Sequence, residues 1–211
     1  MIAKLHYLTQ GNAPQEHLDH LQKACTSGAE WIQLRLNRFS DKKVLKYAEE
    51  AREITAHFQT RLILQDHYKI AKQIKADGVH LENTIASPSS VRKHLYPWQL
   101  MGATAHQLAD VENLLTQELD YLYIGPFKNT NHDSPVKPLA LKGYTLILEA
   151  LSTATPLFSF GEIQLEDVNE ILATGISGLA IDKAITNDFN SIRTFHELLQ
   201  ASSTQEQRHS F

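Results

Sequence analysis

Short apolar runs alternate with helix-patterned segments along the whole chain, and this alternation constrains the fold more than any other feature. The runs of strand character fall near residues 4–8, 31–36, 61–65, 79–81, 100–103, 121–124, 156–160 and 179–181. Each run is followed by residues at helical spacing. Strands that alternate with helices form a parallel sheet, because each helix carries the chain back along the sheet. Eight such units favour closure into a single (β/α)8 TIM barrel of the α/β class.

The predicted barrel fills residues 1–200 without a linker or a domain boundary. A length of 211 residues suits one barrel of this kind. The remaining segment, 201–211, is polar and ends in Arg-His-Ser-Phe, so we expect a disordered C-terminal tail.

Composition argues against several classes of function. The formal net charge is −4, so no basic field attracts nucleic acid or an anionic membrane. No apolar run approaches the roughly 18 residues of a membrane span, and the first residues lack the apolar core of a signal peptide. The single Cys25 cannot form an intramolecular disulfide. We therefore expect a cytoplasmic protein without a nucleic-acid or membrane partner.

Segment 31–37 carries polar side chains where a strand covered by helices should be apolar. Its residues alternate between an apolar set and a polar set, namely Ile32, Leu34 and Leu36 against Gln33, Arg35 and Asn37. The polar set has little reason to be there unless it converges on something polar. A fork-shaped Arg beside an amide suits a phosphate or a carboxylate. A partly solvated strand end is the alternative interpretation.

The active sites of TIM barrels lie at the C-terminal ends of the strands. In this chain those ends are more polar than the strands that carry them: Thr9, Gln33, Arg35, Asn37, Gln65, Asp66, His80, Thr104, His106, Gly125, Pro126, Ser159, Gly161, Asp182 and Lys183. The set favours a small anionic ligand, with a metal ion as an option. It contains no nucleophile–base triad and no Cys/His metal cluster.

Gly161 and Lys183 stand after the seventh and eighth strands, where barrels of this kind commonly bind phosphate through backbone N–H groups and a helix N-terminus. Glu162 brings negative charge to the same loop. In the alternative interpretation Glu162 pairs with Lys183, which leaves a salt bridge and no phosphate. We favour the phosphate interpretation.

Three of the 11 histidines stand where a ligand can meet them. His80 and His106 lie at strand ends, and His132 lies in the long irregular segment 127–143. Long ordered loops in a compact domain are often functional. Histidine titrates near neutral pH, so acid–base chemistry is open to each of the three.

The order of these motifs resembles that of thiamine phosphate synthase and its relative, the thiazole tautomerase, over about residues 4–200. The motifs that carry the resemblance are Gln-Leu-Arg-Leu-Asn at 33–37, Gln-Asp at 65–66, Ala-Asp-Gly-Val-His-Leu at 76–81, Gly-Ala-Thr-Ala-His at 102–106, Asp-Tyr-Leu-Tyr-Ile-Gly-Pro-Phe at 120–127, Thr130, and 177–185. The resemblance implies a (β/α)8 fold and a transferase of thiamine biosynthesis. Such an enzyme joins a pyrimidine diphosphate to a thiazole phosphate and releases diphosphate.

The same resemblance implies roles for individual residues. Gln33 would contact the pyrimidine, and the Gly161 loop would hold the thiazole phosphate. Arg35 and Asp66 would be catalytic, and Asp66 would bind Mg²⁺ with the diphosphate. The implied substrate-binding set is Gln33, Arg35, Gln65, His80, Thr104, His106, Thr130, Gly161 and Lys183. The implied partners are small phosphorylated thiamine precursors, and a homodimer is a further option.

The chain departs from the family pattern at the end that handles diphosphate. Asn37 replaces the family's Lys after the Arg, and Ile85 falls where a second acidic metal ligand is expected. Asp133 stands in place of a loop Lys, and Glu162 in place of a second Gly. We therefore predict that Mg²⁺ binds weakly, or only when diphosphate is present.

Three alternative functions stay open. One is a tautomerase-like isomerase, although Pro126 occupies the position of its acid–base His and another residue such as His132 would have to act. A second is a non-catalytic protein that binds a thiazole or thiamine phosphate. A third is a barrel enzyme recruited to another phosphorylated metabolite, since a fold does not by itself fix a function.

Overall fold

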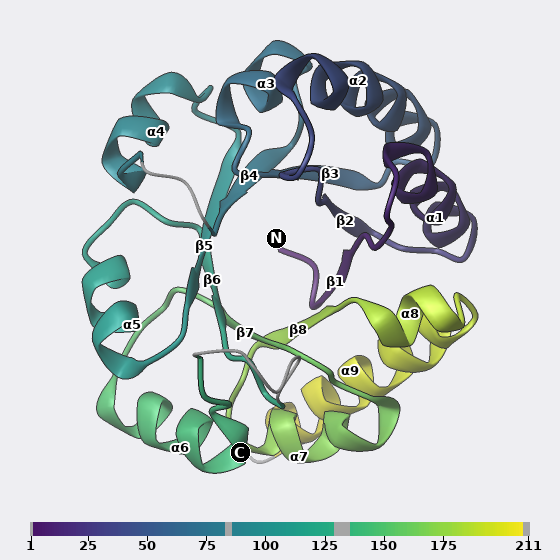
Figure 1. Ribbon diagram of the computed structural model, residues 1–211. Coiled ribbons are helices and arrows are strands. Elements are labelled where there is room, and N and C mark those ends of the chain that lie inside the picture. The colour runs from purple at the N-terminus through teal and green to yellow at the C-terminus, as the bar shows by residue number, and fades with distance from the viewer. Residues whose placement is uncertain (1, 83–85, 129–135, 209–211) are drawn as a thin grey trace.

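A computed structural model, which describes residues 2–82, 86–128 and 136–208, shows a closed barrel of parallel strands ringed by helices (Figure 1). The strands are β1 Leu5–Leu8, β2 Trp31–Leu34, β3 Arg61–Gln65, β4 Gly78–Leu81, β5 Leu100–Ala105, β6 Tyr121–Ile124, β7 Leu157–Phe160 and β8 Gly178–Ile181. Each strand pairs in parallel with the next, and β8 returns to β1 with Leu179 opposite Leu5. The predicted (β/α)8 TIM barrel is confirmed.

Helices cover the outside of the barrel. They are α1 Pro14–Thr26, α2 Asp41–His57, α3 Tyr68–Gln73, α4 Pro88–His94, α5 Leu108–Leu115, α6 Ala140–Ala150, α7 Val168–Ala173 after a 3-10 turn Leu165–Asp167, α8 Lys183–Asn187 and α9 Ser191–Arg208. The last strand, β8, is thus followed by two helices, the short α8 and then α9. Within the described part of the chain, no helix is long and apolar enough to cross a bilayer.

Helix α9 extends into the segment that we expected to be a disordered tail. It continues to Arg208, while residues 209–211 lie outside the described part of the chain. No Gly or Pro occurs between residues 191 and 208, so no residue type that breaks helices ends α9 early.

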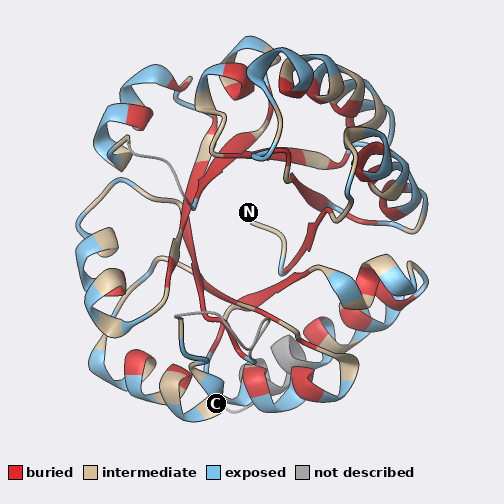
Figure 2. Cartoon of the chain, viewed as in Figure 1, coloured by how far each residue is buried: buried red, intermediate tan, exposed pale blue. Residues whose placement is uncertain are grey.

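Alternate residues of each strand point to opposite faces of the barrel wall and build two cores. The outer core lies between strands and helices, and the apolar set Ile32, Leu34 and Leu36 belongs to it. The inner core fills the barrel with Leu8, Trp31, Ile63, Tyr121, Tyr123, Phe158 and Ala180. Figure 2 shows the strands as a nearly continuous buried ring.

Aromatic rings fill the barrel interior below the site. His6 stacks between Trp31 and Phe158, with ring centroids 4.2 Å away on each side, and its Nδ1 hydrogen bonds with the Tyr123 hydroxyl at 2.9 Å. Burial lowers the pKa of His6 well below its usual range, so the ring is neutral. A Cβ on Gly102 would meet the Tyr121 ring at 2.2 Å, which explains why glycine stands there.

Candidate active site

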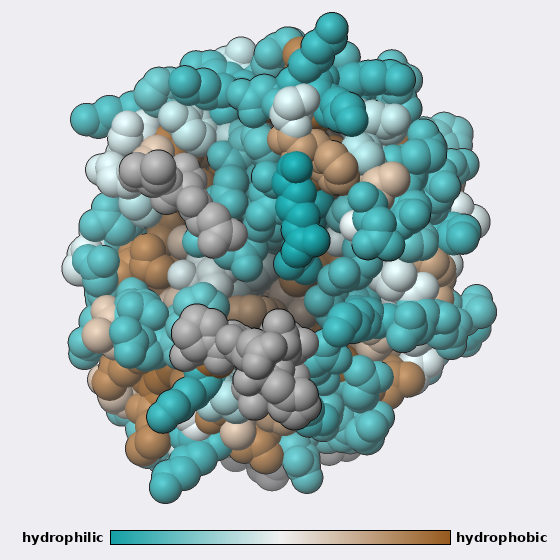
Figure 3. Space-filling model, in the orientation of Figure 1, coloured by the Kyte–Doolittle hydropathy of each residue, from teal (hydrophilic) through white to brown (hydrophobic). Residues whose placement is uncertain are grey.

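The C-terminal ends of the strands surround a cavity of about 190 Å³, which we call the mouth. Its lining is Leu8, Gln10, Gln33, Arg35, Glu82, Thr104, Tyr123, Phe160, Gly161, Glu162, Asp182 and Lys183. Figure 3 shows hydrophilic side chains around a hollow at the centre of this face. Of the predicted binding residues, the mouth brings together Gln33, Arg35, Thr104, Gly161 and Lys183.

Gln33 projects from β2 into the barrel, as the alternation in the sequence predicts. Its side chain is buried, and its Oε1 has no hydrogen-bond partner within the described part of the chain. A buried acceptor without a partner costs about 1–3 kcal/mol. Because Gln33 also lines the mouth, its oxygen is available to a hydrogen-bond donor on a ligand.

Arg35 follows β2 and is oriented by a neighbouring amide. Its Nε donates to Gln65 Oε1 at 3.2 Å, and one terminal nitrogen lies 3.7 Å from Asp182 Oδ2. Gln10 Nε2 donates to that same Asp182 oxygen at 2.9 Å. Since the Arg35 side chain is 30% exposed and its ion pair is long, the guanidinium keeps donors for an anion.

The polar alternation of segment 31–37 stops earlier than expected. Strand β2 ends at Leu34, and Asn37 lies exposed in the following turn. The backbone N–H of Arg35 donates at 3.1 Å to the Thr9 hydroxyl and not to a strand partner. Arg35 therefore reaches the mouth from a loop, and Asn37 does not line it.

Two carboxylates lie on the loops after β3 and β4. Asp66 Oδ1 accepts the backbone N–H of Glu82 at 2.8 Å, and the Glu82 carboxylate accepts from Gln65 Nε2 at 2.5 Å. Glu82 is exposed as a whole residue, but burial of its carboxyl end raises the pKa of Glu82, against the opposing effect of Arg35. Glu82 is a site residue that our sequence prediction missed, although it directly follows the motif at 76–81.

These two carboxylates are the candidate ligands of the predicted Mg²⁺ ion. Asp66 and Glu82 are adjacent, but the described residues contain no group of three or more His, Cys, Asp or Glu that could hold a metal. The prediction that Ile85 replaces a metal ligand lies outside the described residues. So do the predictions for Thr130, His132 and Asp133.

Three predicted binding residues lie behind the mouth and do not line it. Gln65 bridges Arg35 and Glu82. His80 is buried, and its Nε2 hydrogen bonds with the Thr104 hydroxyl at 2.8 Å; burial lowers the pKa of His80 to about 3. His106 Nδ1 donates to the Gly125 carbonyl at 2.8 Å. Each of the three holds a neighbour in place.

The loop after β7 has the backbone of a glycine-rich turn. Gly161 has φ 103° and Glu162 has φ 50°, both in the left-handed region. Lys183 Nζ lies 2.5 Å from Glu162 Oε1, so the ion pair of the alternative interpretation is present. Its hydrogen bond to Glu162 raises the pKa of Lys183. The phosphate interpretation of this loop stays a prediction.

Comparisons with known proteins agree with the motif order. The family model for thiamine monophosphate synthase matches residues 5–185. The thiamine-phosphate synthase of Flavobacterium psychrophilum is 32% identical over 202 residues, which cover 94% of this chain and 98% of that protein. That of Flavobacterium johnsoniae is 33% identical over 190 residues, covering 88% and 90%.

A solved structure shares the fold. The thiamine phosphate pyrophosphorylase from Pyrococcus furiosus superposes with a TM-score of 0.79 at 22% sequence identity, covering 96% of each chain. At that level of identity the likeness concerns the barrel and its helices.

Proposed function

The chain belongs to the thiamine monophosphate synthase family, and we propose that it joins a pyrimidine diphosphate to a thiazole phosphate with release of diphosphate. This makes it a transferase of thiamine biosynthesis. One observation carries the proposal: the buried Gln33 oxygen, which has no hydrogen-bond partner among the described residues, and Arg35 both line the mouth, two residues apart in the family's motif.

The mouth has the parts that such a reaction requires. Breaking the carbon–oxygen bond to diphosphate places negative charge on the leaving group and positive charge on the pyrimidine methylene carbon. Arg35 donates to the leaving oxygens as that charge builds, and Gln65 holds the guanidinium in orientation. The ring nitrogen of the thiazole then forms the new carbon–nitrogen bond. Leu8, Tyr123 and Phe160 supply apolar wall against which the pyrimidine ring can pack.

The Gln33 oxygen selects the orientation of the pyrimidine in this scheme. It accepts a hydrogen bond from an N–H donor on the ring, which relieves the unsatisfied acceptor. On the opposite rim, the Gly161 loop and Lys183 hold the phosphate of the thiazole. Because Lys183 is paired with Glu162, this phosphate has to displace that carboxylate.

The carboxylates fit a Mg²⁺ ion that arrives with the substrate. Mg²⁺ is usually held through one or two carboxylates plus substrate phosphates, and not by an all-protein cage. Asp66 and Glu82 together match that donor set, and the described residues offer no larger one. When bound there, the ion neutralises charge on the diphosphate. Cytoplasmic location and a homodimer stay predictions.

Complementation of a bacterial strain that lacks the synthase tests the proposed function in cells. With purified protein, the pyrimidine diphosphate, the thiazole phosphate and Mg²⁺ should yield thiamine phosphate and free diphosphate in equal amounts. The Arg35→Ala variant should lose most of this turnover, whereas Arg193→Ala, at an exposed site on α9, should keep it. Binding of both precursors by the wild type without release of diphosphate would refute the proposal.

A non-catalytic thiamine or thiazole phosphate binding protein is the second candidate, and one observation favours it. The Lys183–Glu162 ion pair leaves this cation already neutralised at the rim. Such a protein would bind thiamine phosphate by calorimetry and show no turnover. The tautomerase alternative gains no support, because the position of its acid–base His is Pro126.

A further inference from the structure

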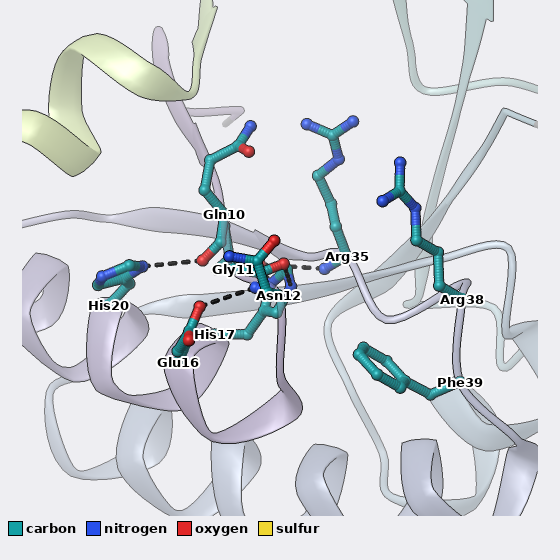
Figure 4. A pocket seen from close by; sticks show the side chains of 10 residues that line it. Gln10, Gly11, Asn12, Glu16, His17, His20, Arg35, Arg38 and Phe39 are labelled. Atoms are coloured by element: carbon teal, nitrogen blue, oxygen red, sulfur yellow. Dashed lines mark hydrogen bonds between the residues drawn. The ribbon is translucent and has the colours of Figure 1, made fainter.

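Figure 4 shows from close by the residues that line a second cavity, of about 420 Å³. The loop between β1 and α1, helix α1 itself and the loop between β2 and α2 form its walls, and we call it the side cavity. It shares two lining residues, Gln10 and Arg35, with the mouth. Arg35 therefore lines both cavities, which places its side chain at the boundary between them.

Two guanidinium groups border the side cavity. Arg35 and Arg38 extend in the same direction from the loop after β2 (Figure 4). Arg38 is exposed and makes no hydrogen bond or ion pair with the part of the chain that the structure describes. Glu16 is the carboxylate in this lining, and its Oε2 accepts the Asn12 backbone N–H at 2.7 Å. The lining therefore carries an excess of positive charge.

The two histidines of the side cavity, His17 and His20, each hydrogen bond with a backbone carbonyl. His17 Nε2 donates to the Gly11 carbonyl at 3.1 Å, and burial lowers the pKa of His17 to about 4. A neutral ring with its proton on Nε2 leaves Nδ1 to accept the Thr9 hydroxyl proton at 2.8 Å. The Thr9 oxygen in turn accepts the Arg35 backbone N–H.

This chain of hydrogen bonds fixes the Arg35 backbone to the floor of the side cavity. Both Thr9 and His17 are buried, so their positions are set by packing as well as by hydrogen bonds. A second contact ties the loop between β1 and α1 to α1 itself, because His20 Nδ1 donates to the Gln10 carbonyl at 2.8 Å. A site whose walls are held before a ligand arrives loses less entropy on binding.

We propose that the side cavity binds a phosphate group between Arg35 and Arg38. Guanidinium groups match phosphate oxygens with two parallel hydrogen bonds each, and two of them bordering one cavity suit a doubly charged group. This phosphate can be the terminal phosphate of the substrate's diphosphate, and that assignment rests on the proposed function. The same chemistry would hold a free inorganic phosphate that binds independently of the substrate.

The test is calorimetric titration of the full chain with two probes, inorganic diphosphate and inorganic phosphate. Arg38→Gln should weaken binding of at least one probe by about tenfold or more, the scale of one hydrogen bond between charged groups. Lys42→Gln is the matched control: it removes one positive charge from an exposed position on α2 outside the cavity lining and should change affinity by less than about twofold. Arg38→Lys, which keeps the charge and loses the fork, should fall between wild type and Arg38→Gln.

The two sources of phosphate give different results. If the site holds the diphosphate tail, phosphate competes with diphosphate, and Arg38→Gln raises KM for the pyrimidine diphosphate. If it holds a free phosphate, both probes bind together and KM is unchanged. Equal affinity of wild type and Arg38→Gln for both probes overturns the inference, as does failure of both probes to bind wild type at millimolar concentration.

Turnover on the same preparations separates this inference from the proposed function. A wild type that makes thiamine phosphate while Arg38→Gln binds both probes normally would retain the function and reject the side cavity. A wild type without turnover whose phosphate binding depends on Arg38 would reject the function and retain the site. Because Arg38 is exposed and unpaired within the described chain, its substitution should leave the fold intact, which circular dichroism checks.

Discussion

The Lys183 ammonium and the Glu162 carboxylate form an ion pair, 2.5 Å between Nζ and Oε1, on the rim of the mouth. The Lys183 side chain is 53% exposed, and exposed pairs contribute about 0–1 kcal/mol. A phosphate brings more negative charge than the single carboxylate, so it can compete with Glu162 for Lys183. The pair would therefore weaken the predicted phosphate binding on this rim without abolishing it.

Glu162→Gln should raise affinity for thiazole phosphate by up to about fivefold, since it removes a competing carboxylate worth about 1 kcal/mol or less. Calorimetry measures this change. Glu197→Gln is the matched control, because Glu197 makes an exposed ion pair with Arg193 on α9, away from the mouth. Unchanged or weaker binding by Glu162→Gln would show that no phosphate reaches Lys183.

Arg35→Ala should reduce affinity for phosphorylated precursors by about 1.5–3 kcal/mol, the scale of hydrogen bonds to a charged group. Its ion pair to Asp182 is long, so stability should change little. Titration against thiamine phosphate and thermal unfolding report the two quantities separately. Wild-type affinity in the variant, with a loss of stability, would identify Arg35 as a structural residue only.

Gln33→Leu separates binding from stability at one position. The variant removes a buried acceptor that has no partner in the described chain, so the free energy of unfolding should stay equal or rise by about 1 kcal/mol. Affinity for the pyrimidine diphosphate should fall because the ligand loses its acceptor. Chemical denaturation and calorimetry measure the pair of effects. A variant that is much less stable and binds normally would contradict the role assigned to Gln33.

His17 should make the protein less stable in acid. Its pKa is about 4 when folded against 6.5 when unfolded, so the unfolded chain binds the extra proton first as pH falls. Its contribution is complete above pH 6.5 and is lost between pH 6.5 and about 4. Between pH 7 and about 4.5 the unfolding free energy of the wild type should therefore fall by about 2–3 kcal/mol more than that of His17→Asn.

Asn suits this test because its side-chain oxygen can accept the Thr9 hydroxyl in place of Nδ1. The control is His57→Asn, at an exposed position at the end of α2, which should leave the pH dependence as it is in wild type. Urea unfolding at a series of pH values gives the free energies. An unchanged slope in His17→Asn would mean that His17 titrates alike in both states.

Mg²⁺ should bind the ligand-free protein weakly and bind more tightly once diphosphate is present, because the described residues provide a pair of carboxylates and no fuller cluster. Asp66→Asn should reduce the diphosphate-dependent affinity, whereas Asp19→Asn, exposed on α1, should not. Calorimetry with Mg²⁺ alone and with diphosphate checks both statements. Tight binding of Mg²⁺ to the ligand-free wild type would point to a further ligand.

The fold was predictable because its signal is local. Alternation along each strand follows from the opposite directions of successive side chains, and helical spacing follows from the helix repeat. Both patterns can be read in a few consecutive residues, such as Ile32, Gln33 and Leu34. The motifs at the strand ends, with the known geometry of barrels, then located the mouth and most of its polar lining.

Other features depend on contacts between distant parts of the chain. Barrel closure brings Gln10 to Asp182 and Glu162 to Lys183, pairs that no local pattern connects. Strand β2 stops at Leu34 because the next backbone N–H finds the Thr9 hydroxyl on another loop. For the same reason the sequence prediction missed Glu82 and Arg38, which have no periodicity to mark them.

Local patterning is thus enough to specify the barrel and the end of it that carries the site, since burial of each strand face repeats with a short period. Which cation is free and which is paired depends on contacts of about 1 kcal/mol between loops far apart in the chain. Arg38 bordering the side cavity and Lys183 beside Glu162 are similar positive charges in the sequence. The closed barrel alone distinguishes them, because it places Glu162 against Lys183 and places no carboxylate of the described residues in an ion pair with Arg38.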